Sequence, residues 1–406
     1  MLCEQSRERH EHAPATSAIL PSYPWSALPY RISTVFTQSK MIEDDGYRAS
    51  SQYRLWSFTE EQLHDQRTET NRIASEKVRR AFNRAQLVAS NGIGEDGTSH
   101  PDINTLTVDE EQRIVQWGCE KILEMKTILE PSPPSQVIAT AIQYLRRFYL
   151  YNSPMTYHPK SIMVSALWMA TKADHFFYKL DKYCHQLGVT EDDVKAPEFL
   201  IMQALRFTLE VRHPTRSLEG GIAEIRLHSS NLKCFKDVAT GQVRKRIDTA
   251  GDKARRLLVA DTQMTDAYFL YTPAQMWLAA VLTVDEQLAI SYIEYLFDRL
   301  GTAVAPIKQK LRDTITECAK LIKSYKSPDN DKATKAELGR IGKKLRKCQD
   351  PEKLDIVEVA RAKAAEKREG TDSDAEKANK KRKLERERLE KDGEVFGPDL
   401  KNVKSG

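Results

Sequence analysis

Two segments of the chain begin with the same aromatic–polar–proline triplet and continue as strongly apolar runs. The first is Tyr157-His-Pro159 followed by KSIMVSALW, and the second, 114 residues further on, is Tyr271-Thr-Pro273 followed by AQMWLAAVL. Proline suits the first turn of a helix, because the N–H that it lacks would be unpaired there in any case. A helix that is apolar on every side must be surrounded by other helices. The two segments therefore predict two copies of a helical unit, each built round a central helix.

The flanking residues carry the same signature. An aromatic, apolar stretch precedes each triplet, RRFYLYN in one case and DAYFLY in the other. Between Thr105 and Val211 apolar residues recur at helical spacing, for example at Val137, Ala141 and Phe148, and no segment shows a credible strand pattern. We expect an all-α protein with two tandem five-helix folds, an extra N-terminal helix and C-terminal helices.

Composition divides the remainder of the chain. Ser57 or Thr59 can cap the N-terminal helix, with Glu60 or Gln62 three residues on. Few apolar residues follow in that helix, so it must lie on the rest of the molecule. The predicted divisions are a disordered arm over 1–55, the N-terminal helix over 56–87, a flexible Gly-rich loop over 88–103, the first repeat over 104–212, a polar linker over 213–243 with the only Gly-Gly pair, the second repeat over 244–326, C-terminal helices over 327–366 and a charged disordered tail over 367–406.

The overall charge argues against a nucleic-acid-binding protein. The formal net charge is +5 and the pI is about 8.7, because acidic residues are mixed with the basic ones. The longest uncharged apolar run, 161–171, is far shorter than the ~20 residues of a membrane span, and no secretory signal opens the chain. We expect a soluble intracellular protein with no membrane partner. The KKRK run over 380–383 fits a nuclear import signal and a solvated charge run equally well.

The sequence offers no convincing catalytic or metal site. The six cysteines include no C-x-x-C pair, and Asp174-His175 with Cys184-His185 fits no standard metal spacing. The glycines over 92–97 match G-x-G-x-x-G, but no strand precedes them, so we interpret them as a flexible loop. P-loop, G-x-S-x-G, H-E-x-x-H and kinase motifs are absent. These observations favour a binding protein over an enzyme, with no cofactor and no metal.

The stretches FYLYNSPMTYHPKSIMVSALWMATK and TDAYFLYTPAQM, with EEQL in the N-terminal helix, resemble cyclins and are most similar to the cyclin H family. The resemblance covers about Tyr53 to Tyr325. It implies two stacked cyclin folds and a regulatory subunit that binds and activates a cyclin-dependent kinase. For cyclin H that kinase is the CDK-activating kinase, which a RING-containing assembly factor joins and which docks on transcription factor IIH in the nucleus. Its implied substrates are the activation loops of other cyclin-dependent kinases and the heptad tail of RNA polymerase II.

The resemblance also assigns a kinase-binding site. Two residues occupy the positions of the family's kinase contacts: Lys172 in MATKADH, at the end of the central helix, and Glu198 in APEFLIM, opening the fifth helix. A lysine in a last turn and a glutamate in a first turn also favour the helix dipole, so the resemblance carries the assignment. The implied apolar neighbours are Met169, Ala173 and Met202, while Phe207 and Leu209 end the helix.

Some positions depart from the family pattern. Asp174-His175 stands where many cyclins have an acidic pair, and Arg146 stands where many have an acidic residue. No Met-Arg-Ala-Ile-Leu stretch is present, so a substrate-recruitment groove of the cell-cycle type is not implied. The alternatives are a C-type or T-type transcriptional cyclin with a different kinase, a DNA-binding tandem cyclin fold like transcription factor IIB, and a helical scaffold with no kinase partner. The factor IIB family carries an N-terminal zinc ribbon, whereas this N-terminus offers a single cysteine, Cys3.

Overall fold

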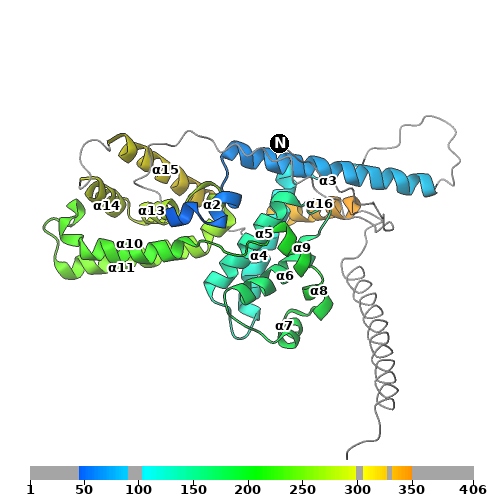
Figure 1. The fold of residues 1–406 in the computed structure, drawn as a ribbon, viewed down its shortest axis with the longest axis horizontal. Helices are drawn as coiled ribbons and strands as arrows, with labels where there is room; N and C mark the ends of the chain where they lie inside the picture. The colour runs from blue at the N-terminus through cyan, green and yellow to red at the C-terminus, as the bar shows by residue number, and fades with distance from the viewer. Residues whose placement is uncertain (1–44, 90–102, 299–304, 327–331, 350–406) are drawn as a thin grey trace, which may run out of the picture. The chain divides into compact units, whose positions relative to one another are not determined.

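The computed structural model describes residues 45–89, 103–298, 305–326 and 332–349. Over these ranges the regular secondary structure is entirely helical, as predicted (Figure 1). No helix in the described ranges is long and apolar enough to cross a membrane. Most of the predicted arm and Gly-rich loop, the stretch 350–366 and the whole predicted tail lie outside the described residues.

Repeat 1 denotes the first group of packed helices and repeat 2 the second (Figure 1). Repeat 1 comprises α4 (Val108–Ile128), α5 (Ser135–Tyr151), α6 (Pro159–Ala173), α7 (Leu180–Leu187), α8 (Glu191–Lys195) and α9 (Glu198–Ala204). Repeat 2 comprises α10 (Pro214–Leu227), α11 (Thr240–Val259), α12 (Ala267–Leu270), α13 (Pro273–Val284), α14 (Glu286–Asp298) and α15 (Ala305–Ser324), with short 3-10 turns η1 (Ser229–Asn231), η2 (Lys233–Phe235) and η3 (Asp261–Met264).

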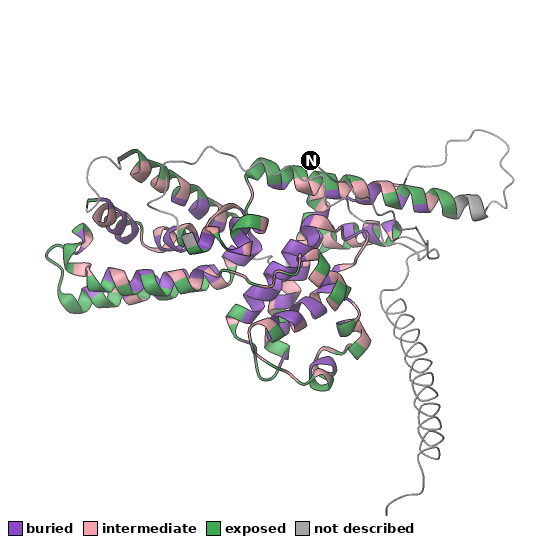
Figure 2. Cartoon of the chain, viewed as in Figure 1, coloured by how far each residue is buried: buried purple, intermediate pink, exposed green. Residues whose placement is uncertain are grey.

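The two proline-opened segments form α6 and α13, each with its proline in the first turn. Both helices contribute to the cores of their repeats. In repeat 1 the helix buried over most of its circumference is α5, which Figure 2 shows largely in purple. Its polar residues Thr140, Gln143 and Arg147 are buried too, so they require hydrogen-bond partners inside the molecule.

The predicted linker over 213–243 is wrong over its first half, because α10 occupies 214–227 and packs against α11 and α13. The Gly-Gly pair that suggested a break lies inside this helix. A Cβ built on Gly221 would stand 2.3 Å from the Trp277 ring, whereas one on Gly220 would meet nothing. Gly221 is therefore needed for the close approach of α10 to α13, and this long-range requirement leaves no local signal in the sequence.

The N-terminal region forms more helix than expected. Residues predicted as the end of the arm form α1 (Asp45–Arg48) and α2 (Ser51–Trp56), and the long helix α3 (Glu60–Ala89) begins after a break at 57–59. Of the two predicted caps the structure uses Thr59. Its hydroxyl accepts from Gln62 N, and the Gln62 side chain accepts from Thr59 N in return.

Helix α3 lies against both repeats and the C-terminal helix α16 (Lys332–Cys348). Leu63 packs with Trp56 of α2 and with Phe269 of repeat 2. Val78 shares a small core with Ile341 of α16. Polar bonds supplement these sparse apolar contacts, and the Thr70 hydroxyl donates to the Leu150 carbonyl at 2.7 Å. The helix is therefore held by contacts along its length rather than by its own propensity.

Candidate functional site

Lys172 lies in the last turn of α6, and the backbone fixes where that helix ends. The N–H of Phe176 donates to Thr171 O at 2.8 Å and the N–H of His175 donates to Lys172 O at 3.4 Å. This is a Schellman motif with His175 at the left-handed position, φ 57°. Glycine is the usual residue there, so the histidine stores a small amount of backbone strain directly beside Lys172.

Glu198 opens α9, and the structure brings it together with Lys172. The ammonium of Lys172 forms an ion pair with the Glu198 carboxylate and also lies 5.5 Å from the centre of the Trp168 ring. The two side chains are 43% and 28% exposed. Both charges therefore stand at one exposed edge of repeat 1, formed by the end of α6 and the start of α9, which we call the α6–α9 edge.

The predicted apolar neighbours divide into two kinds. Ala173 and Met202 are half-buried and pack at the margin of the repeat 1 core. Met169 is only 4% exposed and lies in that core. Its side chain points into the repeat and offers little contact surface in the free chain, so its kinase-binding role stays a prediction.

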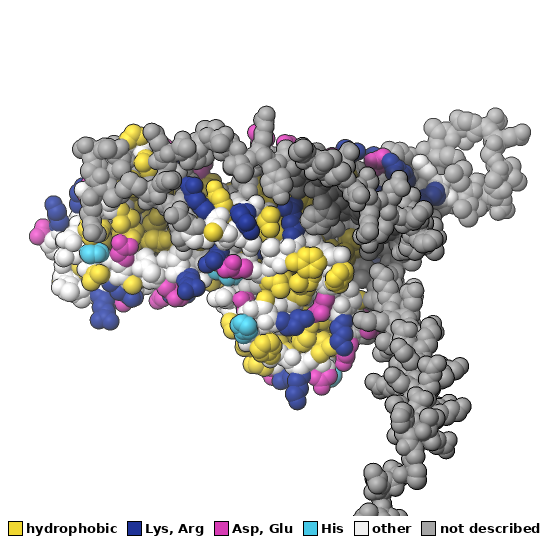
Figure 3. Space-filling model, viewed as in Figure 1, with side chains coloured by type: hydrophobic (Ala, Val, Ile, Leu, Met, Phe, Trp, Pro, Cys, Tyr) yellow, Lys and Arg dark blue, Asp and Glu magenta, His cyan; other side chains and the backbone are white. Residues whose placement is uncertain are grey.

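Two exposed aromatic side chains supply the apolar surface that Met169 does not. Phe199 is 64% and Phe207 60% exposed, and their rings lie edge to face at 6.4 Å. Hydrophobic side chains gather on the face of the molecule that carries α6 and α9 (Figure 3). Phe199 escaped the sequence analysis, although its place outside the buried Ile201–Leu205 stripe of α9 is the signal that could have found it.

The backbone presents Phe207 outward at some cost. Arg206 and Phe207 have φ values of 52° and 55°, in the left-handed region that disfavours bulky residues. Cation–π contacts hold the Arg206 guanidinium, 4.6 Å from the Tyr151 ring centre and 5.8 Å from that of Trp56. Strain of this kind persists only where the surroundings enforce it, and it is concentrated at functional sites.

The pattern Asp174-His175 with Cys184-His185 does not form a metal-binding cluster in the described part of the chain. His175 lies exposed at the helix end, while Asp174 accepts a hydrogen bond from Thr140 and Cys184 is buried. No group of three metal-ligating side chains occurs within the described residues.

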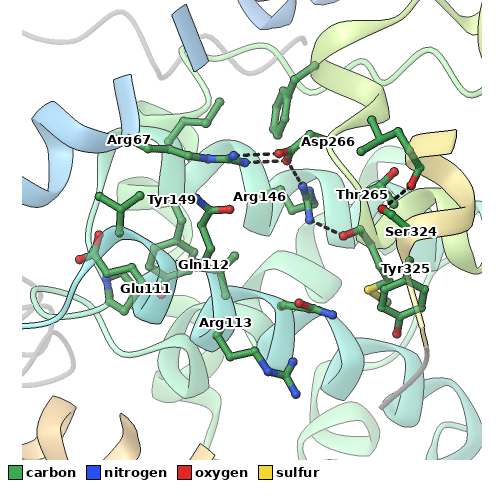
Figure 4. A pocket seen from close by; sticks show the side chains of 18 of the residues that line it. Arg67, Glu111, Gln112, Arg113, Arg146, Tyr149, Thr265, Asp266, Ser324 and Tyr325 are labelled. Carbon is green, nitrogen blue, oxygen red and sulfur yellow. Dashed lines mark hydrogen bonds and ion pairs between the residues drawn. The ribbon is translucent and has the colours of Figure 1, made fainter. Parts of the chain in front are cut away.

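A cavity of about 610 Å³ lies where α3, α4, α5, α15 and α16 meet the start of α12. Figure 4 shows three of its charged groups turned toward one another: Arg67 donates twice to Asp266, at 2.8 and 2.6 Å, and Arg146 also pairs with Asp266. Burial alone would raise the Asp266 pKa, but the two guanidinium groups lower it below its usual value. The cavity wall is thus a junction that ties α3, repeat 1 and repeat 2 together.

This junction explains one departure from the family pattern. Arg146 stands where many cyclins have an acidic residue, and its partner is Asp266 from the TDAYFLYTP stretch. In the same cavity wall the buried carboxyl of Glu111 accepts a hydrogen bond from Ser153. Burial raises the pKa of Glu111 to about 7.

Comparisons with known proteins agree with this architecture. The cyclin N-terminal domain model matches residues 112–210 and the cyclin C-terminal domain model matches residues 213–323, so the fold is that of two cyclin domains in tandem. Cyclin CCL1 of Saccharomyces cerevisiae is 31% identical over 261 residues, which are 64% of this chain and 63% of that protein. Cyclin-H of Xenopus laevis is 27% identical over 207 residues, 49% of this chain and 60% of that protein.

Among solved structures, the chain is similar to one in the CAK complex from Chaetomium thermophilum bound to ATP-gamma-S. The TM-score is 0.66 and the identity 31%, over 79% of this chain and 94% of that one. The chain therefore belongs to the cyclin family, in the group of cyclin H and its relatives, as the sequence resemblance indicated. The matched stretches span less than two thirds of the two curated relatives.

Proposed function

We propose that this chain is the regulatory cyclin of a CDK-activating kinase: it binds a cyclin-dependent kinase and switches it on. The observation that carries the proposal is the α6–α9 edge. There Lys172, Glu198 and two exposed aromatic rings stand together on a tandem cyclin fold. The similarity to a chain of the Chaetomium thermophilum CAK complex supports the same function.

The proposed mechanism is a shift in the kinase's conformational population. A kinase is active when its αC helix is turned inward and its Lys–Glu ion pair has formed. Moving that equilibrium from 1:99 to 99:1 requires ~5.5 kcal/mol of preferential binding to the inward state. Phe199 and Phe207, with Ala173 and Met202 at the margin, offer apolar contact area at ~25 cal/mol per Å² buried.

The Lys172–Glu198 pair determines the orientation in which the kinase docks. Lys172 can donate to main-chain carbonyls of the kinase, and Glu198 can accept from its amides. Such bonds fix the register of docking more than they add affinity. The two side chains are paired with each other and only partly exposed in the free chain, so they are held close to the positions from which they would reach the kinase.

The proposal extends to the assembly. We infer that a RING-containing assembly factor joins the pair, that the complex docks on the core of transcription factor IIH in the nucleus, and that no group of this chain takes part in catalysis. The implied substrates are cyclin-dependent kinase activation loops and the polymerase heptad tail. The similarity to a chain of the CAK complex and to cyclin-H supports the kinase part of this placement.

A reconstitution tests the function. The kinase used comes from the organism that encodes this chain. Among that organism's cyclin-dependent kinases it is the one whose sequence is most similar to the kinase of the Chaetomium thermophilum complex. Adding the purified chain should increase phosphorylation of a heptad-repeat peptide and of a kinase activation-loop substrate. A chain that folds, neither binds this kinase nor stimulates it, and binds other cyclin-dependent kinases instead would refute the CAK assignment.

A further inference from the structure

An unbroken chain of hydrogen bonds, buried at its repeat 2 end and part-buried beyond it, crosses from repeat 2 to the α6–α9 edge. Gln263 Nε2 donates to the Tyr268 hydroxyl at 2.6 Å, and that hydroxyl lies 3.0 Å from Nδ1 of His213. His213 Nε2 lies 2.9 Å from the hydroxyl of Thr140, which donates to Oδ2 of Asp174 at 2.6 Å. Asp174 caps α6, two residues after Lys172.

The chemistry of the groups fixes the direction of every proton in this chain. A carboxylate can only accept hydrogen bonds, so the Thr140 hydroxyl donates its single proton to Asp174. The Thr140 oxygen must therefore accept a hydrogen bond from His213. His213 therefore carries its proton on Nε2, which leaves Nδ1 to accept from the Tyr268 hydroxyl. The Tyr268 oxygen in turn accepts from Gln263, whose amide also donates to the Leu258 carbonyl at 3.0 Å.

The surroundings keep the histidine neutral, as this pattern requires. Burial, reinforced by the nearby charge of Arg147, lowers the pKa of His213 to about 3. Hydrogen bonds in a low-dielectric interior polarise one another, so a chain with all its protons aligned is stronger than its separate bonds. Its members come from both repeats: Thr140 and Asp174 from repeat 1, and the other three from the start and middle of repeat 2.

The end of the chain coincides with the strained end of α6. Asp174 precedes His175, the non-glycine residue in the left-handed conformation, and the Lys172 carbonyl accepts from the His175 N–H. The side chain of Asp174 thus ties this cap to α5 through Thr140. Without that tie, relief of the strain at His175 would turn the last turn of α6 and move Lys172.

We propose that Thr140, His213 and Asp174 are positioning residues that hold Lys172 in its docking geometry and couple the α6–α9 edge to the packing of repeat 2. The inference rests on the proposed function for its consequence in kinase binding, but its geometric core concerns the free chain alone. None of the three residues is required to touch the kinase.

The first test uses the free chain, labelled with ¹⁵N-histidine. We expect the NMR signature of a neutral Nε2–H tautomer for His213, unchanged between about pH 5 and pH 8. Thr140→Val should shift that signal and Thr140→Ser should restore it. A proton on Nδ1, or titration of His213 near its ordinary pKa, overturns the proposal.

The second test measures kinase affinity by calorimetry. Thr140→Val and Asp174→Ala should each weaken binding by about fivefold or more, with no further loss when they are combined, because both break the same chain. Asp174 is only partly buried, so its variant keeps the test decisive if Thr140→Val fails to fold. The matched control is Thr262→Val, which removes another buried hydroxyl, bonded to the Leu257 carbonyl, and should leave affinity unchanged.

The outcomes separate the two proposals. If Lys172→Ala with Glu198→Ala weakens binding but Thr140→Val and Asp174→Ala do not, the positioning role is overturned and the proposed function stands. If the Lys172–Glu198 double variant also binds normally, the docking site itself is wrong. Additive losses from the Thr140 and Asp174 variants would likewise overturn the shared chain.

Discussion

Exchanging the two charges of the α6–α9 edge separates its role in binding from its role in stability. Lys172→Glu combined with Glu198→Lys retains an intramolecular ion pair but reverses the charge that each helix end presents. The side chains are 43% and 28% exposed, and exposed pairs contribute ~0.2–1 kcal/mol. Each reversed charge also opposes the dipole of its helix, at ~0.3–1 kcal/mol apiece, so the free energy of unfolding should fall by about 2 kcal/mol at most and the melting temperature by less than about 8 °C.

Kinase binding should respond far more strongly to the same exchange. Truncating one partner of a hydrogen-bonded charged contact costs ~2–5 kcal/mol, and 1.4 kcal/mol is a factor of ten, so we expect a loss of at least about thirtyfold. For the simpler Lys172→Ala with Glu198→Ala variant we expect at least about tenfold, with a nearly unchanged melting temperature.

Calorimetric titration with the kinase and thermal unfolding monitored by circular dichroism make the comparison. The matched control is the exchange of Lys233 and Glu294, an ion pair of repeat 2 with side chains 59% and 25% exposed. The control should bind like the parent chain. Undiminished affinity in the Lys172–Glu198 exchange, with the chain still folded, would remove the α6–α9 edge from the kinase interface.

Three further outcomes can be measured directly. The double variant Phe199→Ser with Phe207→Ser should have an unchanged or raised melting temperature, because both rings are exposed. In the same calorimetric assay it should bind the kinase about tenfold more weakly or worse. An affinity equal to that of the parent chain would show that the aromatic pair does not contact the kinase. Gly221→Ala should lower the free energy of unfolding in urea by ~1–3 kcal/mol, since its Cβ would meet an indole ring at 2.3 Å, whereas Gly220→Ala should be neutral or stabilising by up to about 1 kcal/mol; equal effects of the two would contradict the close approach of α10 and α13. Glu111 binds its proton more tightly in the folded chain, where its pKa is about 7, so its contribution to stability declines as pH rises from about 4.5 to about 7. The Glu111→Gln variant should therefore be as stable as the parent chain at pH 4.5 and more stable at pH 8, by ~1.4 kcal/mol per unit of pKa shift at most. Parallel stability–pH curves for the two chains would disprove this.

The sequence predicted most where the physical signal was local. Proline followed by a strongly apolar run predicts a helix that packs into a core, and α6 and α13 both begin at these prolines and contribute to the cores of their repeats. In repeat 1, however, the more completely buried helix is α5. The Thr59–Gln62 capping box is equally local, because both members lie within one helical turn. The regular spacing of apolar residues then excluded a sheet.

What the sequence could not show depends on contacts between distant residues. Gly221 resembles a helix breaker until Trp277, which lies against it from α13, is known. Phe199 was missed because α9 is only seven residues long, too short for its buried stripe to be recognised in the sequence. The burial of Met169 in α6 depends on the packing of repeat 1, which the sequence does not show. The hydrogen-bond chain through His213 bonds residues up to 73 positions apart, and nothing near His213 in the sequence indicates it.

The kinase-binding assignment of Lys172 and Glu198 came from family resemblance, because charges at helix ends have an adequate explanation in the helix dipole. The structure adds a physical argument that the positions of Lys172 and Glu198 in the sequence do not provide. Two parts of the α6–α9 edge are braced by elements outside it: the end of α6 through Asp174 and Thr140, and Phe207 through the neighbouring Arg206 on Trp56 and Tyr151. A surface that must shift a kinase equilibrium by ~5.5 kcal/mol loses part of its binding free energy if it has to become ordered on contact. A braced edge avoids that loss, so we expect the bracing residues to matter to activation although they need not touch the kinase.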